Sequence, residues 1–539
     1  MIFLQSVIYF IIIYKIIVIL RKDSDVMKSS KKPKWFRDLL RRRLFFCLLI
    51  LVQLAGLLFY IFNGSRTSLV ISRALQLISI AVAIHIISRR DKEAYKLTWV
   101  FFILIFPIFG GLLYLFFFCQ THSRKFLKRD EKIRDRMQSA RLPESAFAEA
   151  AESVPDRARQ IEYLEKYAGF PIYENESAEY FSPGEKFWER LLCDLAEAKR
   201  YIFIESFIIE DGEMWDPILS ILKRKAAESV DVRILYDDMG CFLRLPKNFA
   251  AELRKHGIRC KVFNRFVPLL SAVQNFRDHR KIVAIDGRVA YTGGLNIADE
   301  YINKTQPFGH WKDAGVRIEG EGAFSFSLMF LKMWMLAGQD ETDLSAYLPE
   351  KTEKRKVSDG FVQPYASEPL ASKNVSEEVY MQIISRAKKY VYIETPYLII
   401  DNSMISALTV AAKSGVDIRI MTPFHWDKRF VHFMTRSYYR ELLRAGIKIY
   451  EYTPGFIHSK VFISDDEIAT VGSANMDFRS LYLQFECGVF FCKTKMISEV
   501  RDDFLQTVSV CKEMTEEDCK SNAFVRFLQD LFRLFAPLL

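Results

Sequence analysis

Long apolar runs are concentrated at the amino-terminal end of the chain. Residues 44–62 and 97–118 are each long enough to cross the hydrocarbon core of a bilayer, and we expect both to be membrane spans. Residues 69–88 are equally long but contain several polar side chains, which is typical of a span whose polar face packs against neighbouring helices. The pattern predicts a transmembrane helical region over residues 1–120 and a multi-pass protein of the cell membrane.

Residues 2–20 allow two interpretations. They form either a fourth span or an uncleaved signal-like segment, because no small-residue cleavage site is evident. Met27 begins a basic stretch that resembles the amino terminus before a first membrane helix, so residues 1–26 could precede the natural start. The basic loop 21–43 indicates a cytoplasmic location for that loop. The segment after the last predicted span is also basic, so the side of the membrane stays open.

Beyond residue 160 the pattern changes to short β-branched and aromatic runs, typical of buried strands, that alternate with segments of helical periodicity. These runs occur in two passes with the same order. Residues 198–209 resemble 387–398, and residues 229–237 resemble 415–423. The repetition predicts an α/β protein built from two tandem sandwich domains, each with a mixed sheet.

The charge pattern marks the boundaries of these domains. We expect a charged connector over residues 121–160, a first α/β domain over 161–340, a charged linker over 341–375 and a second α/β domain over 376–539. The second domain ends in an apolar tail with a wide hydrophobic stripe. This tail could rest in a membrane interface or pack onto the second domain.

One short pattern, H-x-K-x4-D, occurs once in each pass. The chain contains only 8 histidines, so two chance occurrences of this spacing are very improbable. The two copies are HRKIVAID, with His279, Lys281 and Asp286, and HSKVFISD, with His458, Lys460 and Asp465. The pattern predicts a duplicated chemical unit.

The residue types in this unit fit chemistry on a phosphate ester. One imidazole can attack phosphorus and a second can protonate the departing oxygen, so a pseudo-twofold axis could bring His279 and His458 together across one cleft. Lys281 and Lys460 lie two residues from their histidines, on the same face of a strand, and can neutralise phosphate oxygens. This chemistry requires no metal or other cofactor, and no histidine and carboxylate cluster has the spacing of a metal site.

Other repeat-equivalent residues are candidates for supporting roles. Asn296 and Asn475 follow a Gly-Gly and a Gly-Ser pair, where small residues allow a ligand to approach, although a simple turn would also explain the glycines. Asp313 and Glu486 occupy matched positions in the segments DAGV and ECGV, and we expect these carboxylates to orient the two imidazoles. The aspartates that end the two H-x-K-x4-D patterns precede turns and are expected to be partly structural.

The charge of the chain bears on its partners. A formal net charge of +10 is spread across loops and juxtamembrane stretches, which suits a surface that faces anionic lipid headgroups. Basic proteins also bind nucleic acid, but the predicted spans make lipid the simpler explanation. We therefore expect phospholipid partners and no nucleic acid.

The two H-x-K-x4-D patterns, each followed by GG or GS and then Asn, resemble the phospholipase D superfamily. Together with the predicted spans that end in AYKLTWVFFILIFPIFGGLLYLFF and with WKDAGVRIEG and GSANMDFRS, they are similar to the bacterial cardiolipin synthases of that superfamily. The resemblance extends from about residue 44 to the last residue. One departure is Gln484, where the family pattern leads us to expect Asn.

The resemblance implies two phospholipase D-like α/β sandwich domains with pseudo-twofold symmetry. It implies that one phosphatidylglycerol transfers its phosphatidyl group to a histidine and releases glycerol, and that a hydroxyl of a second phosphatidylglycerol then attacks to give cardiolipin. It also implies two catalytic triads, His279, Lys281, Asp286 and His458, Lys460, Asp465, all present without substitution. By analogy with the superfamily, His279 is the nucleophile and His458 acts first as acid and then as base. Acyl-chain preference and oligomeric state stay open.

Other functions share the same two patterns. A hydrolytic phospholipase D would use water as the acceptor, and another phosphatidyltransferase would use an alcohol such as serine or ethanolamine. A membrane protein with a vestigial repeat would have lost at least one of the two patterns, and both are intact. The predicted spans favour the synthase, because a lipid acceptor has to be presented at the bilayer.

Overall fold

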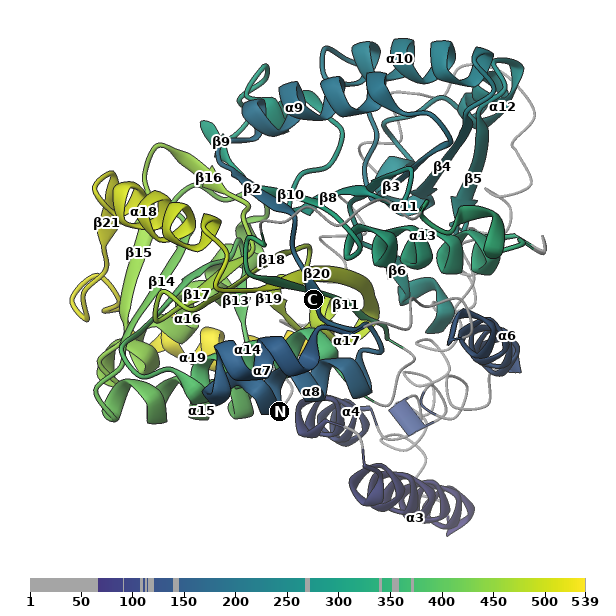
Figure 1. Ribbon diagram of the computed structural model, residues 1–539. Coiled ribbons are helices and arrows are strands. Elements are labelled where there is room, and N and C mark those ends of the chain that lie inside the picture. The colour runs from purple at the N-terminus through teal and green to yellow at the C-terminus, as the bar shows by residue number, and fades with distance from the viewer. Residues whose placement is uncertain are drawn as a thin grey trace. The chain divides into compact units, whose positions relative to one another are not determined.

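The computed structural model describes residues 66–90, 92–106, 110–111, 114, 121–138, 145–266, 272–338, 342–350, 358–369 and 373–538. The chain divides into two units, one of residues 1–68 with 267–269 and one of residues 69–266 with 270–539. Both repeated halves lie in the second unit, to which the following description refers (Figure 1).

Two helices occupy part of the predicted transmembrane region. Helix α3 (Arg66–Ser88) covers the predicted span 69–88, whereas α4 (Glu93–Ile105) covers only the first part of 97–118. In the described part of the chain, no helix combines the length and apolarity that crossing a membrane requires. The structure therefore does not support these two spans; α4, with 13 residues, is only about 20 Å long. The predicted spans at 2–20 and 44–62 lie outside the described residues.

Each half contains a mixed sheet, as the sequence predicts. The first sheet has the order β2 (Ser177–Phe181), β10 (Gly315–Glu319), β8 (Val289–Gly293), β7 (Ile282–Ile285), β3 (Tyr201–Ser206), β4 (Asp231–Asp237), β5 (Arg259–Phe263). The second contains β1 (Tyr173–Glu174), β11 (Phe361–Ser367), β20 (Gln484–Cys492), β18 (Ile468–Gly472), β17 (Val461–Ser464), β12 (Tyr390–Glu394), β14 (Asp417–Pro423), β15 (Lys448–Tyr452) and β21 (Cys511–Glu513). In both sheets three neighbouring strands are parallel and the rest are antiparallel, and β11 to β15 repeat the order of β2 to β5.

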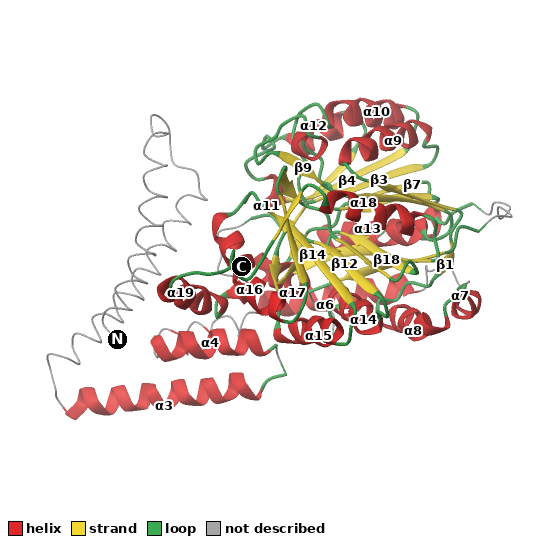
Figure 2. Ribbon diagram, turned by 90° about the vertical axis from the view of Figure 1, so that its left-hand side faces the viewer, coloured by secondary structure: helices red, strands yellow, loops and turns green. Residues whose placement is uncertain are grey.

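Helices form layers outside and between the sheets (Figure 2). The first half carries α9 (Gly184–Glu197), α10 (Trp215–Ala227), α11 (Asp238–Cys241), α12 (Phe249–Lys255) and α13 (Ala323–Ala337). The second carries α14 (Val375–Arg386), α15 (Asn402–Lys413), α16 (Arg429–Arg444), α17 (Phe478–Leu483), α18 (Met496–Val508) and α19 (Ala523–Arg533). Figure 2 shows α13 and α18 between the two sheets, and both contribute to a core cluster that contains strands of both halves. This position explains why α13 is buried around its whole circumference and is largely apolar, with Lys332 paired to Asp130 and Glu368.

Two short parallel strand pairs connect the halves. They are β6 (Arg277–Asp278) with the start of β20, and β9 (His310–Lys312) with β16 (Gly455–Ile457). The two pairs are repeat-equivalent. In each pair one strand directly precedes the histidine of an H-x-K pattern, and the paired residues of the other strand directly precede one of the matched carboxylates. These pairs determine the geometry of the site.

The predicted linker and tail both contain ordered structure. Within 341–375, strand β11 is buried along its whole length and pairs with β20, so this segment is more than a charged linker. The connector 121–160 contains α6 (Thr121–Gln138), α7 (Phe147–Ser153) and part of α8 (Ala158–Tyr167). In the apolar tail, Phe532 of α19 packs against Phe430 and Phe433 of α16, while Phe524 and Phe527 are exposed.

Candidate active site

The strand pairs between the halves fix both histidines of the repeated pattern. His279 follows β6 and donates its backbone N–H to Phe485 O of β20 at 3.0 Å. His458 follows β16 and donates its backbone N–H to Lys312 O of β9 at 2.7 Å. Each histidine is therefore hydrogen-bonded to the opposite half of the molecule, next to the carboxylate that the opposite half supplies.

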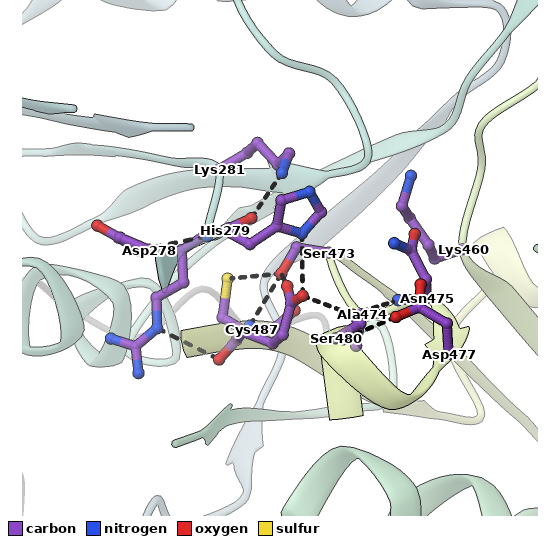
Figure 3. Close-up of polar contacts among 12 residues, drawn as sticks. Asp278, His279, Lys281, Lys460, Ser473, Ala474, Asn475, Asp477, Ser480 and Cys487 are labelled. Atoms are coloured by element: carbon purple, nitrogen blue, oxygen red, sulfur yellow. Dashed lines mark hydrogen bonds and ion pairs between the residues drawn. The ribbon is translucent and has the colours of Figure 1, made fainter. Parts of the chain in front are cut away.

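The carboxylate beside His279 is Glu486 of the second half. Nδ1 of His279 lies 2.9 Å from Glu486 Oε1. Glu486 is fully buried, and the hydroxyls of Ser473 and Ser480 donate to its two carboxylate oxygens (Figure 3). Burial acts to raise the pKa of Glu486, but His279 and Lys281 outweigh it and the pKa is lowered. An ionised Glu486 holds the imidazole proton on Nδ1, so the lone pair of Nε2 is available for chemistry.

The carboxylate beside His458 is Asp313 of the first half. Nδ1 of His458 lies 2.7 Å from Asp313 Oδ2, and Asp313 Oδ1 accepts the Ala314 N–H at 2.8 Å. A Cβ atom at Gly294 would overlap Asp313 Oδ1, so a side chain at this position would displace the carboxylate. The two imidazole–carboxylate pairs thus cross between the halves, which the matched positions in the sequence do not reveal.

Two buried lysines lie beside the histidines. Nζ of Lys281 donates to His279 O at 2.6 Å, and Nζ of Lys460 donates to His458 O. Burial lowers the pKa of Lys281 to about 8 and that of Lys460 to about 7. Figure 3 shows His279 and Lys281 on one side of the site and Lys460 on the other. Two partly ionised ammonium groups in a buried site can stabilise the negative charge of a phosphate group.

Both imidazoles are neutral at neutral pH. Burial lowers the pKa of His279 to about 4, although Glu486 acts to raise it. Burial, together with the charge of Lys460, lowers the pKa of His458 to about 3, although Asp313 acts to raise it. The neutral ring is the nucleophilic form, and an anionic phosphodiester in the cleft would raise the pKa of both rings towards the range where one can donate a proton.

The aspartates of the two patterns are not beside the imidazoles. Asp286 and Asp465 end β7 and β17, at the opposite end of the strand from the histidine, and both have left-handed backbone conformations (φ of 53° and 61°). The Asp286 carboxylate accepts the backbone N–H groups of residues 199–201. The Asp465 carboxylate likewise accepts those of residues 388–390, and the buried Arg157 donates to it at 2.8 Å. Six residues of largely extended chain lie between each histidine and its aspartate, which places them roughly 20 Å apart.

The two asparagines line the site but differ in their contacts. Asn296 Oδ1 accepts the Ile208 N–H at 3.1 Å, and its Nδ2 donates to the Tyr301 hydroxyl at 2.6 Å. Asn475 is equally buried, and its Oδ1 is without a hydrogen-bond partner among the described residues. The repeat-equivalent amides are therefore occupied in one half and partly available in the other.

Both histidines open onto a single cavity of about 1160 Å³. Aromatic rings flank the imidazoles, with Phe207 5.1 Å from His279 and with Trp311 and Tyr301 5.3 and 5.5 Å from His458 between ring centroids. The sequence analysis does not single out these rings. Charged groups also line the cavity: Glu210, Asp211, Arg244, Arg277, Asp299, Glu300, Asp427, Lys428, Asp477 and Arg479. In the described residues, no group of three or more His, Cys, Asp or Glu side chains is arranged to hold a metal ion.

Two family models match the chain. One, described as "Cardiolipin synthase, PLD-like domain", matches residues 191–308 and 380–508, which contain both H-x-K-x4-D patterns. The other, described as "Phospholipase_D-nuclease N-terminal", matches residues 77–117.

Individual proteins match over most of the chain. A cardiolipin synthase of Halalkalibacterium halodurans is 34% identical over 86% of this chain and 92% of its own length. A cardiolipin synthase of Geobacillus kaustophilus is 33% identical over 91% of this chain and 98% of its own length. The solved structure of phosphatidylserine synthase from Haemophilus influenzae covers 71% of this chain and 99% of its own, with a TM-score of 0.54 and 13% identity, so it shows a common fold.

Proposed function

Since this chain belongs to the cardiolipin synthase family, we propose that it transfers a phosphatidyl group from one phosphatidylglycerol to another and so forms cardiolipin and glycerol. The observation that supports this most directly is the crossed pairing of His279 with Glu486 and of His458 with Asp313 around one cavity. Two oriented imidazoles are what a double displacement at phosphorus requires.

In the first step, Nε2 of His279 attacks phosphorus of the donor lipid. The bond between phosphorus and the glycerol oxygen breaks, and His458 gives its proton to that oxygen as glycerol leaves. In the second step, His458 takes the proton from a hydroxyl of the second phosphatidylglycerol, whose oxygen attacks phosphorus while the bond to His279 breaks. Lys281 and Lys460 stabilise the phosphate oxygens in both steps.

The other predicted residues have supporting roles in this proposal. Asp286 and Asp465 are positioning residues, because their carboxylates join the end of each motif strand to the neighbouring strand. Asn296 and Asn475 both line the cavity: the Asn475 amide can contact the phosphate or the glycerol headgroup, whereas the Asn296 amide, held by Ile208 and Tyr301, can offer only its second Nδ2 hydrogen. We also propose the domain boundaries given by the charge pattern, except that β11 within 341–375 belongs to the sheet of the second half. A multi-pass location in the cell membrane is proposed from the apolar runs before residue 120.

The direct test supplies the purified chain with phosphatidylglycerol as the only lipid and measures cardiolipin and free glycerol together. Equal amounts of the two products are expected. Phosphatidic acid as the only lipid product would indicate hydrolysis and would refute the transfer. The His458→Asn variant, mixed with a phosphate-labelled phosphatidyl donor whose nitrophenyl leaving group departs without a proton, should retain label on His279, and an unlabelled protein would refute the covalent step.

A further inference from the structure

Two exposed loops occupy repeat-equivalent positions beside the cavity. The first, residues 242–248, follows β4 and α11 in the first half. The second, residues 424–428, follows β14 and precedes α16 in the second half. Arg244 of the first loop and Lys428 of the second both line the cavity, so the two loops flank its mouth from opposite halves. They are called the rim loops below.

The rim loops expose large apolar side chains to solvent. In the first loop, Phe242 is 51% exposed and Leu243 is 92% exposed. In the second, Phe424 is 38% exposed and Trp426 is 49% exposed. An isolated exposed side chain needs no explanation, but apolar side chains gathered at both edges of one cavity mouth indicate an interaction surface.

The charges of the rim loops favour an anionic partner. The first loop contains two basic residues and no acidic residue; Arg244 pairs with Glu210 and Glu300, and Lys247 is the second basic residue. In the second loop Lys428 lies 3.8 Å from Asp427, and Arg429 begins α16 directly after the loop. Both loops combine aromatic and basic side chains. This composition is typical of protein segments that lie at the headgroup level of a bilayer. An anionic lipid surface attracts basic side chains at both edges of the mouth and is where the substrates of the proposed function lie.

We propose that the rim loops insert into an anionic lipid bilayer and hold the cavity mouth against the headgroups. Leu243 and Trp426 then contact the acyl region from the two sides of the mouth. Phosphodiester groups reach the histidines while the acyl chains stay in the bilayer, so neither substrate has to leave the membrane completely. This inference rests on the proposed function for the identity of the substrate, but the insertion itself does not depend on the reaction.

Insertion is tested on the full chain reconstituted into vesicles of phosphatidylcholine and phosphatidylglycerol. A fluorophore attached at Leu243→Cys should be quenched by lipids that carry a spin label on the acyl chain. The same fluorophore at Val410→Cys, on α15 and 64% exposed but away from the cavity, should not be quenched. The chain without an added cysteine gives the labelling background. A fluorophore at position 243 that is not quenched overturns the proposal, whether water or another protein segment covers the loop.

The contribution to turnover is tested with the double variant Leu243→Ser, Trp426→Ser. Neither side chain lines the cavity, so turnover of a short-chain, water-soluble phosphatidylglycerol should stay within about twofold of the unaltered chain, whereas turnover of long-chain lipid in vesicles should fall by about tenfold or more. The matched control is Val410→Ser, Leu505→Ser, which removes exposed apolar side chains elsewhere and should change neither rate. Equal losses on both substrates would overturn the proposal. Quenching at position 243 without cardiolipin formation on any substrate would refute the proposed function and leave the insertion supported.

Discussion

Replacement of Glu486 by Gln tests the carboxylate charge beside His279, because it removes this charge and keeps the packing of the side chain. Glutamine has the shape of glutamate, and its amide oxygen can keep the hydrogen bond with His279 Nδ1. The amide nitrogen would then face Ser473, whose hydroxyl can accept from it and donate instead to Cys487 O, 3.3 Å away. The fold should therefore tolerate the change, with a melting temperature close to that of the unaltered chain.

The rate should fall because the imidazole becomes positively charged when it attacks phosphorus. A hydrogen bond to a charged group contributes about 1.5–3 kcal/mol, so losing the carboxylate charge should lower turnover roughly 10- to 150-fold. Glu486 acts to raise the pKa of His279, so its removal lowers that pKa further and leaves the ring neutral. The expected loss therefore arises in the transition state, not from a change in the protonation of the free enzyme.

The crossed pairs make the test specific. In a phosphodiester with a nitrophenyl group, the nitrophenolate leaves without being protonated. The first step of this substrate therefore needs the nucleophile His279 but not the acid His458. The initial burst of nitrophenol should be slowed by Glu486→Gln, whereas Asp313→Asn, which acts through His458, should leave the burst largely intact and slow only the later turnover. Wild-type turnover for Glu486→Gln, or equal effects of the two variants on the burst, would refute this division of roles.

Three further changes test other parts of the site. Gly294→Ser should displace Asp313 and lower turnover by about 100-fold without loss of folded protein, whereas retained activity would show that the carboxylate position is unimportant. Asp465→Asn should lower the free energy of unfolding by about 1–3 kcal/mol in denaturant titrations while the folded fraction keeps its activity; an inactive but stable variant would contradict a positioning role. Lys460 loses its charge as pH rises through its lowered pKa of about 7, so kcat/KM should begin to fall there, and Lys460→Arg should move this fall up to the pKa of Lys281, about 8.

The sequence predicts a mixed sheet in each half and the same order of strands along the two passes. Buried strands are recognisable as β-branched and aromatic runs, and each pass supports the interpretation of the other. It misses β11, since that strand, Phe361–Ser367, follows a highly charged stretch and contains Gln363 and Pro364 among its buried residues. It also predicts two spans, at 69–88 and 97–118, that the described helices do not support.

The site is predicted in its residue types but not in its connections. Matched positions in a repeat identify Asp313 and Glu486, because a carboxylate precedes the same Gly-Val pair after the H-x-K pattern in each pass. Which carboxylate meets which histidine depends on β6 with β20 and β9 with β16. These strands pair over only two or three residues, too few for any periodicity to appear in the sequence.

The crossing has a consequence for how the two halves depend on each other. A half taken alone would keep its histidine and lysine but would lack the carboxylate that orients the imidazole. We therefore do not expect a single half to keep half of the turnover. The orientation of both imidazoles instead depends on the packing between the halves, which α13, α18 and the shared core hold together. The exchange of carboxylates also explains why the equivalent small positions differ: Gly294 leaves room for Asp313, whereas Ser473 donates to the longer Glu486. Each half has therefore diverged to fit the carboxylate that it places against the other half's histidine.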